Sequence, residues 1–256
     1  MSLRIKFTGT GSGLAVKERF QSSFLLFTDD SVTLTDCGDG ISKALAAAGE
    51  DPCLINRIII THFHPDHYAG FPFLIVQMKI LGRKTPLTVY APSGDISFLR
   101  ELLHRSYIFT ERISFSLEFK ELNDGDVISD NSGVSIEIRR NSHLDEYRKY
   151  DLNGALSFTS FSMTISDGEK EVFYSGDIGG ISDITGGVTG KTGIIITETS
   201  HISSEEILGL IESSDKKIYL THLDYDKETE LKNLLDSAPE LNGRYIFAAD
   251  GMTIEY

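Results

Sequence analysis

The chain has 256 residues, 40% of them hydrophobic, which is enough to bury a large core. Its formal net charge of -14 disfavours long nucleic acid as a partner, because an acidic surface repels a polyanion unless a basic patch or bound cations reverse the field. The apolar stretches are too short to span a membrane, and two cysteines are too few for a disulfide framework, so we expect a cytoplasmic protein with no membrane partner.

The first half of the chain alternates short apolar strands with amphipathic helices. A glycine turn follows the first strand, and a hairpin around Asp29 and Asp30 joins the next two. In chain order we expect strands at 3–7, 23–28 and 31–35, a helix at 41–48, a strand at 58–60, a helix at 71–81, a strand at 87–90 and a helix at 96–106.

The second half repeats this alternation without any visible sequence repeat. We expect strands at 134–139, 160–165, 171–174, 193–197, 218–220, 245–248 and 252–255, with helices at 203–212 and 227–237. No linker divides the two halves, so residues 1–256 are predicted to form one domain. Two strand-rich halves with appended helices suit two sheets packed face to face and covered by helices.

The most informative segment is Thr61-His62-Phe63-His64-Pro65-Asp66-His67, which follows the buried strand at 58–60. In an extended loop His62 and His64 point to the same side, and Pro65 forces a turn that brings Asp66 and His67 to a neighbouring position. Such a loop can serve two metal ions about 3.5 to 4 Å apart. The alternative is a polar surface loop, or histidines satisfied by hydrogen bonds in the core.

This loop resembles the HxHxDH signature of the metallo-β-lactamase superfamily. The superfamily's other motifs are matched in order: Asp36 after a strand, His143, Asp177 in Ser-Gly-Asp, and His222 after a strand. The resemblance implies an α/β fold, the αββα four-layer sandwich of that superfamily, and a metal-dependent hydrolase. It also implies that Asp36 braces the histidine loop and binds no metal.

The resemblance further implies a ligand set for two divalent metal ions. One ion would be bound by His62, His64 and His143, the other by Asp66, His67 and His222, and Asp177 would bridge them. The donor types suit zinc first, with manganese or iron as alternatives. Taken singly, His143, Asp177 and His222 also have ordinary interpretations as loop, turn and strand-end residues.

In the implied reaction the two ions lower the pKa of a bridging water to form hydroxide, and Asp66 also orients that water or accepts its proton.

Three further segments most resemble the ribonuclease Z-like phosphodiesterase branch of the superfamily: the glycine turn at 9–13, residues 249–252 and residues 197–201. Within the last segment, His201 is our candidate general acid for the leaving alkoxide, held by Glu198. The alternative is a helix-start histidine without a catalytic task, next to the cap formed by Ser203 and Glu206.

Two departures from ribonuclease Z favour a small-molecule phosphoester over transfer RNA. The family pattern would place a histidine at Thr197, and the short interval between His143 and Asp177 leaves little room for a tRNA-gripping arm. We therefore predict a phosphodiesterase acting on small nucleotide or phosphate esters, including cyclic ones. The alternatives are a ribonuclease Z-type tRNA 3′ endonuclease, a thioester or lactone hydrolase with the same metal centre, and a ligand-binding module without efficient turnover. The resemblance also leads us to expect a homodimer.

Two other segments carry weaker signals. The glycines at 9–13 lack the G-x-G-x-x-G spacing of a dinucleotide site, so we expect a tight turn near the metal site. Residues 145–151 follow a predicted ligand and form either a rim that contacts phosphate through Arg148 or Lys149, or a solvated loop.

Overall fold

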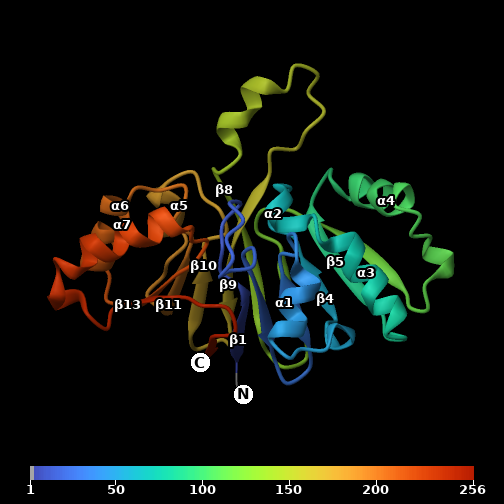
Figure 1. The fold of residues 1–256 in the computed structure, drawn as a ribbon, viewed down its shortest axis with the longest axis horizontal. Helices are drawn as coiled ribbons and strands as arrows, with labels where there is room; N and C mark the ends of the chain where they lie inside the picture. The colour runs from blue at the N-terminus through green and yellow to red at the C-terminus, as the bar shows by residue number, and fades with distance from the viewer. Residues whose placement is uncertain (1–2) are drawn as a thin grey trace.

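In the computed structural model, which describes residues 3–256, two seven-stranded sheets pack face to face and helices cover the outer face of each (Figure 1). This arrangement is the predicted αββα four-layer sandwich. The twenty buried apolar residues of the central core lie between the two sheets, where every second side chain of a strand points inward.

The first sheet has the strand order β14-β1-β2-β3-β4-β5-β6. Its first four strands pair antiparallel and its last four, from β3 to β6, pair parallel. The strands are β1 (Arg4–Gly9), β2 (Ser23–Phe27), β3 (Val32–Thr35), β4 (Arg57–Ile59), β5 (Leu87–Pro92), β6 (Leu117–Leu122) and β14 (Thr253–Glu255).

The second sheet has the order β13-β12-β11-β10-β9-β8-β7, antiparallel from β7 to β10 and parallel from β10 to β13. The strands are β7 (Val127–Ser129), β8 (Ser135–Asn141), β9 (Ser160–Ser166), β10 (Glu171–Tyr174), β11 (Thr192–Thr197), β12 (Lys217–Leu220) and β13 (Tyr245–Phe247).

Two separate helical layers cover the sheets, and each has its own buried apolar cluster. The first layer contains α1 (Ile41–Ala47), η1 (Pro52–Leu54), α2 (Pro65–Tyr68), α3 (Phe71–Ile80), α4 (Ile96–Arg105) and η2 (Thr110–Arg112). The second contains α5 (Ile181–Thr185), α6 (Ser204–Ser213), α7 (Tyr225–Asp236) and η4 (Pro239–Leu241). Within the described residues, every helix is too short or too polar to cross a bilayer.

Most predicted elements form within one to three residues of their expected bounds. The strands β6 and β7 were not predicted, and their sequences explain why. β6 exposes or half-exposes most of its side chains and is an edge strand that pairs with β5 in the described sheet, so it lacks the continuous apolar run of an inner strand. β7 has three residues, of which only Ile128 is buried.

The parallel strands position the site. β3 and β4 of the first sheet and β10, β11 and β12 of the second all deliver their carboxyl ends to one edge of the sandwich. The loops after these ends carry the predicted functional residues, and ligands of open α/β sheets bind at such ends.

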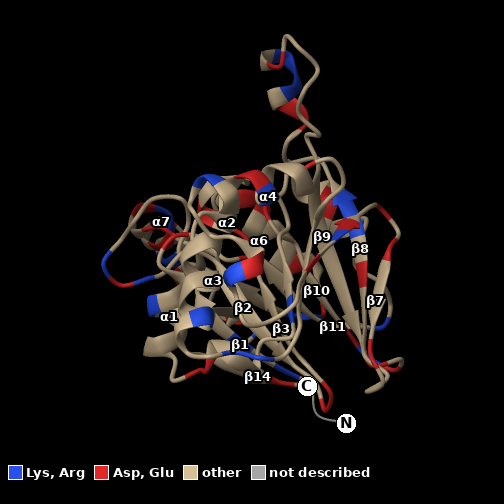
Figure 2. Ribbon diagram, turned by 90° about the vertical axis from the view of Figure 1, so that its right-hand side faces the viewer, with Lys and Arg blue, Asp and Glu red and all other residues tan. Residues whose placement is uncertain are grey.

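A projecting segment, residues 142–159, joins β8 to β9 and is called the arm below. It contains the short helix η3 (Asp145–Tyr150) and rises above the same edge of the sandwich in both views (Figures 1 and 2). In η3 two acidic residues, Asp145 and Glu146, precede two basic residues, Arg148 and Lys149. The arm is short, in agreement with the short interval between His143 and Asp177 in the sequence.

Candidate metal centre

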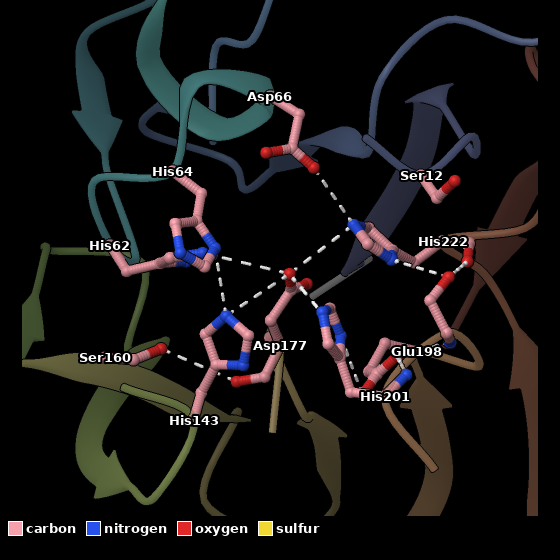
Figure 3. A network of polar contacts seen from close by, with 12 residues as sticks. Ser12, His62, His64, Asp66, His143, Ser160, Asp177, Glu198, His201 and His222 are labelled. Carbon is pink, nitrogen blue, oxygen red and sulfur yellow. Dashed lines mark hydrogen bonds and ion pairs between the residues drawn. The ribbon is translucent and has the colours of Figure 1, made fainter. Parts of the chain in front are cut away.

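The structure brings all seven predicted metal ligands to one place, although they come from four separate segments, which follow β4, β8, β10 and β12. Their donor atoms fall into two groups, and within each group the atoms lie within 4.8 Å of one another. The groups are His62, His64, His143 and Asp177, and Asp66, His67, Asp177 and His222. Asp177 belongs to both groups and lies at the middle of the site (Figure 3).

In the first group the nitrogen atoms surround one carboxylate oxygen. Nε2 of His62 and Nε2 of His143 each lie 3.8 Å from Oδ2 of Asp177. Nε2 of His143 is 3.1 Å from Nδ1 of His64. Three imidazole nitrogens and a carboxylate oxygen directed at a common point form the donor set of a transition-metal site.

The second group shares the same oxygen. Oδ2 of Asp177 lies 3.3 Å from Nε2 of His67 and 3.5 Å from Nε2 of His222. Oδ2 of Asp66 lies 3.5 Å from Nε2 of His67 and 3.3 Å from Nε2 of His222. The glycine turn passes beside this group, since a Cβ on Gly13 would be 3.1 Å from Oδ2 of Asp66.

Among the residues that the structure describes, three of these donor atoms are buried without a hydrogen-bond partner: Nε2 of His62, Nε2 of His67 and Oδ2 of Asp177. Burying a polar atom without a partner costs free energy, so such atoms are rare in folded proteins. Because all three point at the two groups, divalent cations would satisfy them together. The residues present therefore fit the metal ions that the fold implies.

The protein environment favours the ligand forms of these side chains. Burial lowers the pKa of His62 well below its usual value and that of His143 to about 4, so both imidazoles keep a free lone pair at neutral pH. Burial alone would raise the pKa of Asp177, but His222 and His67 outweigh it and hold that pKa well below the ordinary range. For His67, burial is outweighed by Asp177 and Asp36, which raise its pKa. A cation at the second group would replace the proton that this site attracts.

Asp36 braces the histidine loop through buried hydrogen bonds. Its Oδ1 accepts from the backbone nitrogen of Thr61 at 2.8 Å and its Oδ2 contacts Nδ1 of His67 at 2.8 Å. The hydroxyl of Thr61 donates to the same carboxylate. This arrangement directs Nε2 of His67 toward the donor group, and it agrees with the bracing role that the resemblance implied.

Close backbone packing also fixes this loop. A Cβ on Gly38 would lie 1.8 Å from the carbonyl oxygen of Asp66, and a Cβ on Gly70 would lie 2.2 Å from that of Gly38. Only glycine permits these approaches. Asp36 and His222 both adopt left-handed backbone conformations, with φ of 58° and 56°. Such strain in residues other than glycine concentrates at functional sites.

Two positioning residues were missed by sequence reasoning. The hydroxyl of Ser200 donates to the carbonyl oxygen of His222 at 2.7 Å and lies 3.2 Å from its Nδ1, which holds the ring. Asn141 accepts from the backbone nitrogen of His143 and donates to the carbonyl oxygen of Ser175. The available signal was their position, because each is a polar residue at or near a strand end beside a ligand loop.

The structure also brings the candidate acid to this site. Oε1 of Glu198 lies 3.3 Å from Nδ1 of His201, and Oε2 accepts from the backbone nitrogens of Ser200 and His201. The His201 ring lies 4.5 Å from that of His143 (Figure 3). Burial lowers the pKa of His201, but Glu198 outweighs it, so that the pKa is raised. Ser203 and Glu206 form the capping box of α6 by themselves. The His201 ring instead faces the donor groups, with Nδ1 3.8 Å from Oδ2 of Asp177.

A family model described as Anti-Pycsar protein Apyc1 matches residues 3–238. The chain belongs to this family. Among curated relatives of this Apyc1-family chain, the ribonuclease Z of Methanosarcina acetivorans is 33% identical over 126 residues, which is 49% of this chain and 40% of the relative. The ribonuclease BN of Salmonella paratyphi B is 27% identical over 252 residues, covering 88% of this chain and 79% of the relative. The chain thus spans less than half the length of the ribonuclease Z that it matches.

The fold of the Apyc1-family chain also matches solved structures. The metallo-β-lactamase fold protein YhfI from Bacillus subtilis superposes with a TM-score of 0.75 at 19% identity, covering 100% of both chains. The predicted resemblance to the metallo-β-lactamase superfamily and its ribonuclease Z-like branch is confirmed. The prediction of a metal-dependent hydrolase agrees with the named relatives.

Proposed function

We infer that the chain is a metal-dependent phosphodiesterase that cleaves small nucleotide or phosphate esters, including cyclic ones. The observation that carries this inference is the pair of donor groups sharing Oδ2 of Asp177. His62, His64 and His143 would hold one ion, Asp66, His67 and His222 the other, and Asp177 both. Zinc suits these donors first, with manganese or iron as alternatives.

Bound divalent cations supply Lewis-acid polarisation of phosphoryl oxygens and acidify a water molecule. The chain's own residues complete the chemistry. The Asp66 carboxylate is partly exposed, so it can orient the attacking water and accept its proton. His201 is a third exposed and stands on the opposite side of Asp177, where its imidazolium can protonate the leaving alkoxide (Figure 3). Glu198 raises the pKa of His201 and so favours the protonated imidazole that such an acid needs.

The surface charge favours a small substrate. The chain carries 24 basic and 38 acidic side chains, and the arm balances each basic residue with an acidic one (Figure 2). Nε of Arg148 is 3.2 Å from Asp145, which leaves the arm without a free basic cluster to grip a polyanion. The curated relatives named ribonuclease Z and ribonuclease BN favour the second candidate, a tRNA 3′ endonuclease.

A substrate panel tests the function. Zinc- or manganese-loaded protein is assayed with bis(p-nitrophenyl) phosphate, cyclic nucleotides, precursor tRNA, an acyl thioester and a lactone. We expect turnover of the small phosphodiesters. Robust thioester or lactone cleavage with every phosphodiester inert would reject the proposal, whereas preferential tRNA cleavage would select the second candidate. Bound metal without any turnover would indicate a ligand-binding module.

One histidine pair provides a matched control. His64 belongs to the first donor group, whereas His104 on α4 is exposed and belongs to neither group. His64→Ala is expected to abolish turnover and lower metal content, and His104→Ala to leave both unchanged.

A further inference from the structure

A pocket of about 230 Å³ opens beside the metal centre, between the arm and the start of α4. Its wall includes the ligand His64 and the apolar side chains of Phe63, Leu144, Tyr147 and Leu156. Small-molecule pockets generally begin at about 300 Å³, so this one has room for a single ring system but not for a string of nucleotides.

Aromatic rings connect the pocket to the metal site. The Tyr147 ring lies 5.5 Å from the His64 ring and 6.5 Å from that of His143. On the other side, Phe63 packs against Tyr68 at 5.1 Å and Phe98 at 5.6 Å, which fixes its ring. Aromatic side chains beside a catalytic centre offer faces on which a planar heterocycle stacks.

A strained residue lies in the same wall. Phe158 adopts a left-handed conformation with φ of 49°, which is rare for a bulky side chain and costs conformational energy. The guanidinium of Arg148 lies 5.4 Å from the centre of the Phe158 ring. The arm therefore holds Phe158 at the pocket in a conformation that an unconstrained loop would avoid.

Asp95 supplies one polar group to the pocket. It occupies the N-cap position of α4, yet its side chain makes no capping hydrogen bond. Instead Oδ2 accepts from the hydroxyl of Ser157 on the arm. Within residues 3–256, Oδ1 has no hydrogen-bond partner, and burial raises the pKa of this carboxyl. A half-buried carboxylate beside apolar side chains is disfavoured until a donor pairs with it.

We propose that this pocket binds the planar heterocyclic base of the substrate, with an N–H group at the base edge donating to Oδ1 of Asp95. The proposal rests on the proposed function of the metal site, and it assigns a recognition site for the non-reacting part of the substrate. A base held beside His64 leaves its attached phosphoester at the two donor groups. Leu156, which is 62% exposed in the free protein, would be covered by the bound base.

Binding of free nucleosides tests the pocket without any catalysis. Adenosine, guanosine, cytidine, uridine and ribose are titrated against the metal-free chain of 256 residues by ligand-observed NMR. We expect at least one nucleoside to bind and ribose not to bind. Tyr147→Ala should weaken that binding about fivefold or more, from the typical contribution of a base stacked on an aromatic ring. Leu156→Ala should also weaken it about fivefold, because the variant loses apolar area that the base would cover. Nucleosides that bind no better than ribose would overturn the proposal.

The arm offers a matched control. Leu152 is 92% exposed and does not line the pocket, so Leu152→Ala makes the same chemical change on the same segment. It should leave nucleoside binding unchanged. An equal loss in Leu152→Ala and Leu156→Ala would show that the arm, and not the pocket, determines binding, and would overturn the proposal.

Asp95→Asn tests the recognition of the base edge. The amide oxygen can still accept from Ser157, while the amide NH2 replaces the open acceptor at Oδ1. Binding of the preferred nucleoside should fall about tenfold, as expected for a lost hydrogen bond to a charged group. Unchanged binding would overturn the role of Asp95.

Kinetics separate this proposal from the function it rests on. For a cyclic nucleotide that is hydrolysed, Leu156→Ala should raise KM and leave kcat unchanged. If no phosphodiester is hydrolysed, the proposed function fails, while nucleoside binding still tests the pocket. If phosphodiesters are hydrolysed but no nucleoside binds, the pocket proposal fails and the function stands.

Discussion

Replacing Asp36 by asparagine should uncouple the histidine loop from its brace while keeping nearly the same shape. The Asp36 side chain is fully buried and receives hydrogen bonds from the Thr61 backbone, the Thr61 hydroxyl and His67. An amide has one acceptor oxygen where the carboxylate has two. In either orientation, its NH2 group faces a donor, namely the Thr61 N–H or the Nδ1–H of His67.

The size of the effect follows from that mismatch. One buried donor left unpaired costs about 1–3 kcal/mol, so we expect the free energy of unfolding of the metal-free protein to fall by about 2 kcal/mol. If the NH2 group faces His67, the ring must carry its proton on Nε2, the atom that points at Asp177. Loss of such an outer partner typically lowers metal affinity about 10- to 100-fold.

Thermal unfolding of the metal-free proteins and competitive zinc titration measure the two effects. Asp130→Asn is the control, because Asp130 also accepts several hydrogen bonds, from Thr28, Ser31 and Ser132, but contacts no residue of the donor groups. It should lower stability and leave zinc affinity intact. Native-like zinc affinity in Asp36→Asn would refute the bracing role.

Three further predictions concern the candidate acid, the packing of the histidine loop and the Asp95 carboxyl. His201→Ala should lower kcat by about 10²- to 10⁴-fold at unchanged metal content. Glu198→Gln should move the alkaline limb of the pH profile of kcat to lower pH, because it removes the group that raises the His201 pKa. An unshifted limb would argue against His201 as the general acid. Gly38→Ala should lower the free energy of unfolding by about 1–3 kcal/mol, because its Cβ meets the backbone oxygen of Asp66. Gly209→Ala, in open space on α6, should raise the free energy of unfolding by about 1 kcal/mol. Equal melting temperatures of the two variants would contradict the close packing at Gly38. Burial raises the Asp95 pKa, so the folded state disfavours the carboxylate above that pKa. Asp95→Asn should therefore have a higher melting temperature than the native protein at pH 7, and the difference should close as the pH falls through the folded pKa toward 3.8. A lower melting temperature of the variant at pH 7 would contradict a cost of burying the carboxylate.

Local sequence determined what could be predicted without coordinates. The segment from Thr61 to His67 places four donors within six positions, so its chemistry was readable from spacing and turn geometry alone. The apolar runs of inner strands such as β10 and β11 gave their positions for the same reason. His143, Asp177 and His222 were assigned by resemblance, because spacing along the chain does not show which distant loops meet.

The remaining features depend on contacts between segments far apart in the sequence. In the sequence, Asp95 looks like an ordinary helix-capping residue. Its carboxylate accepts a hydrogen bond from Ser157 because the arm lies beside the start of α4. In the sequence, Gly38 looks like an ordinary turn residue. In the structure, the carbonyl oxygen of Asp66 lies so close to Gly38 that no Cβ can be accommodated there. Ser200 likewise gains its role from the approach of His222 at the next strand end.

An anomalous-difference map from crystals of the zinc-loaded protein, recorded at the zinc absorption edge, examines the metal site most directly. Two peaks per chain are expected on either side of Oδ2 of Asp177, one against His62, His64 and His143 and the other against Asp66, His67 and His222. A map with no peak at these residues, or with zinc bound only elsewhere, would contradict the proposed metal centre and the hydrolytic function built on it.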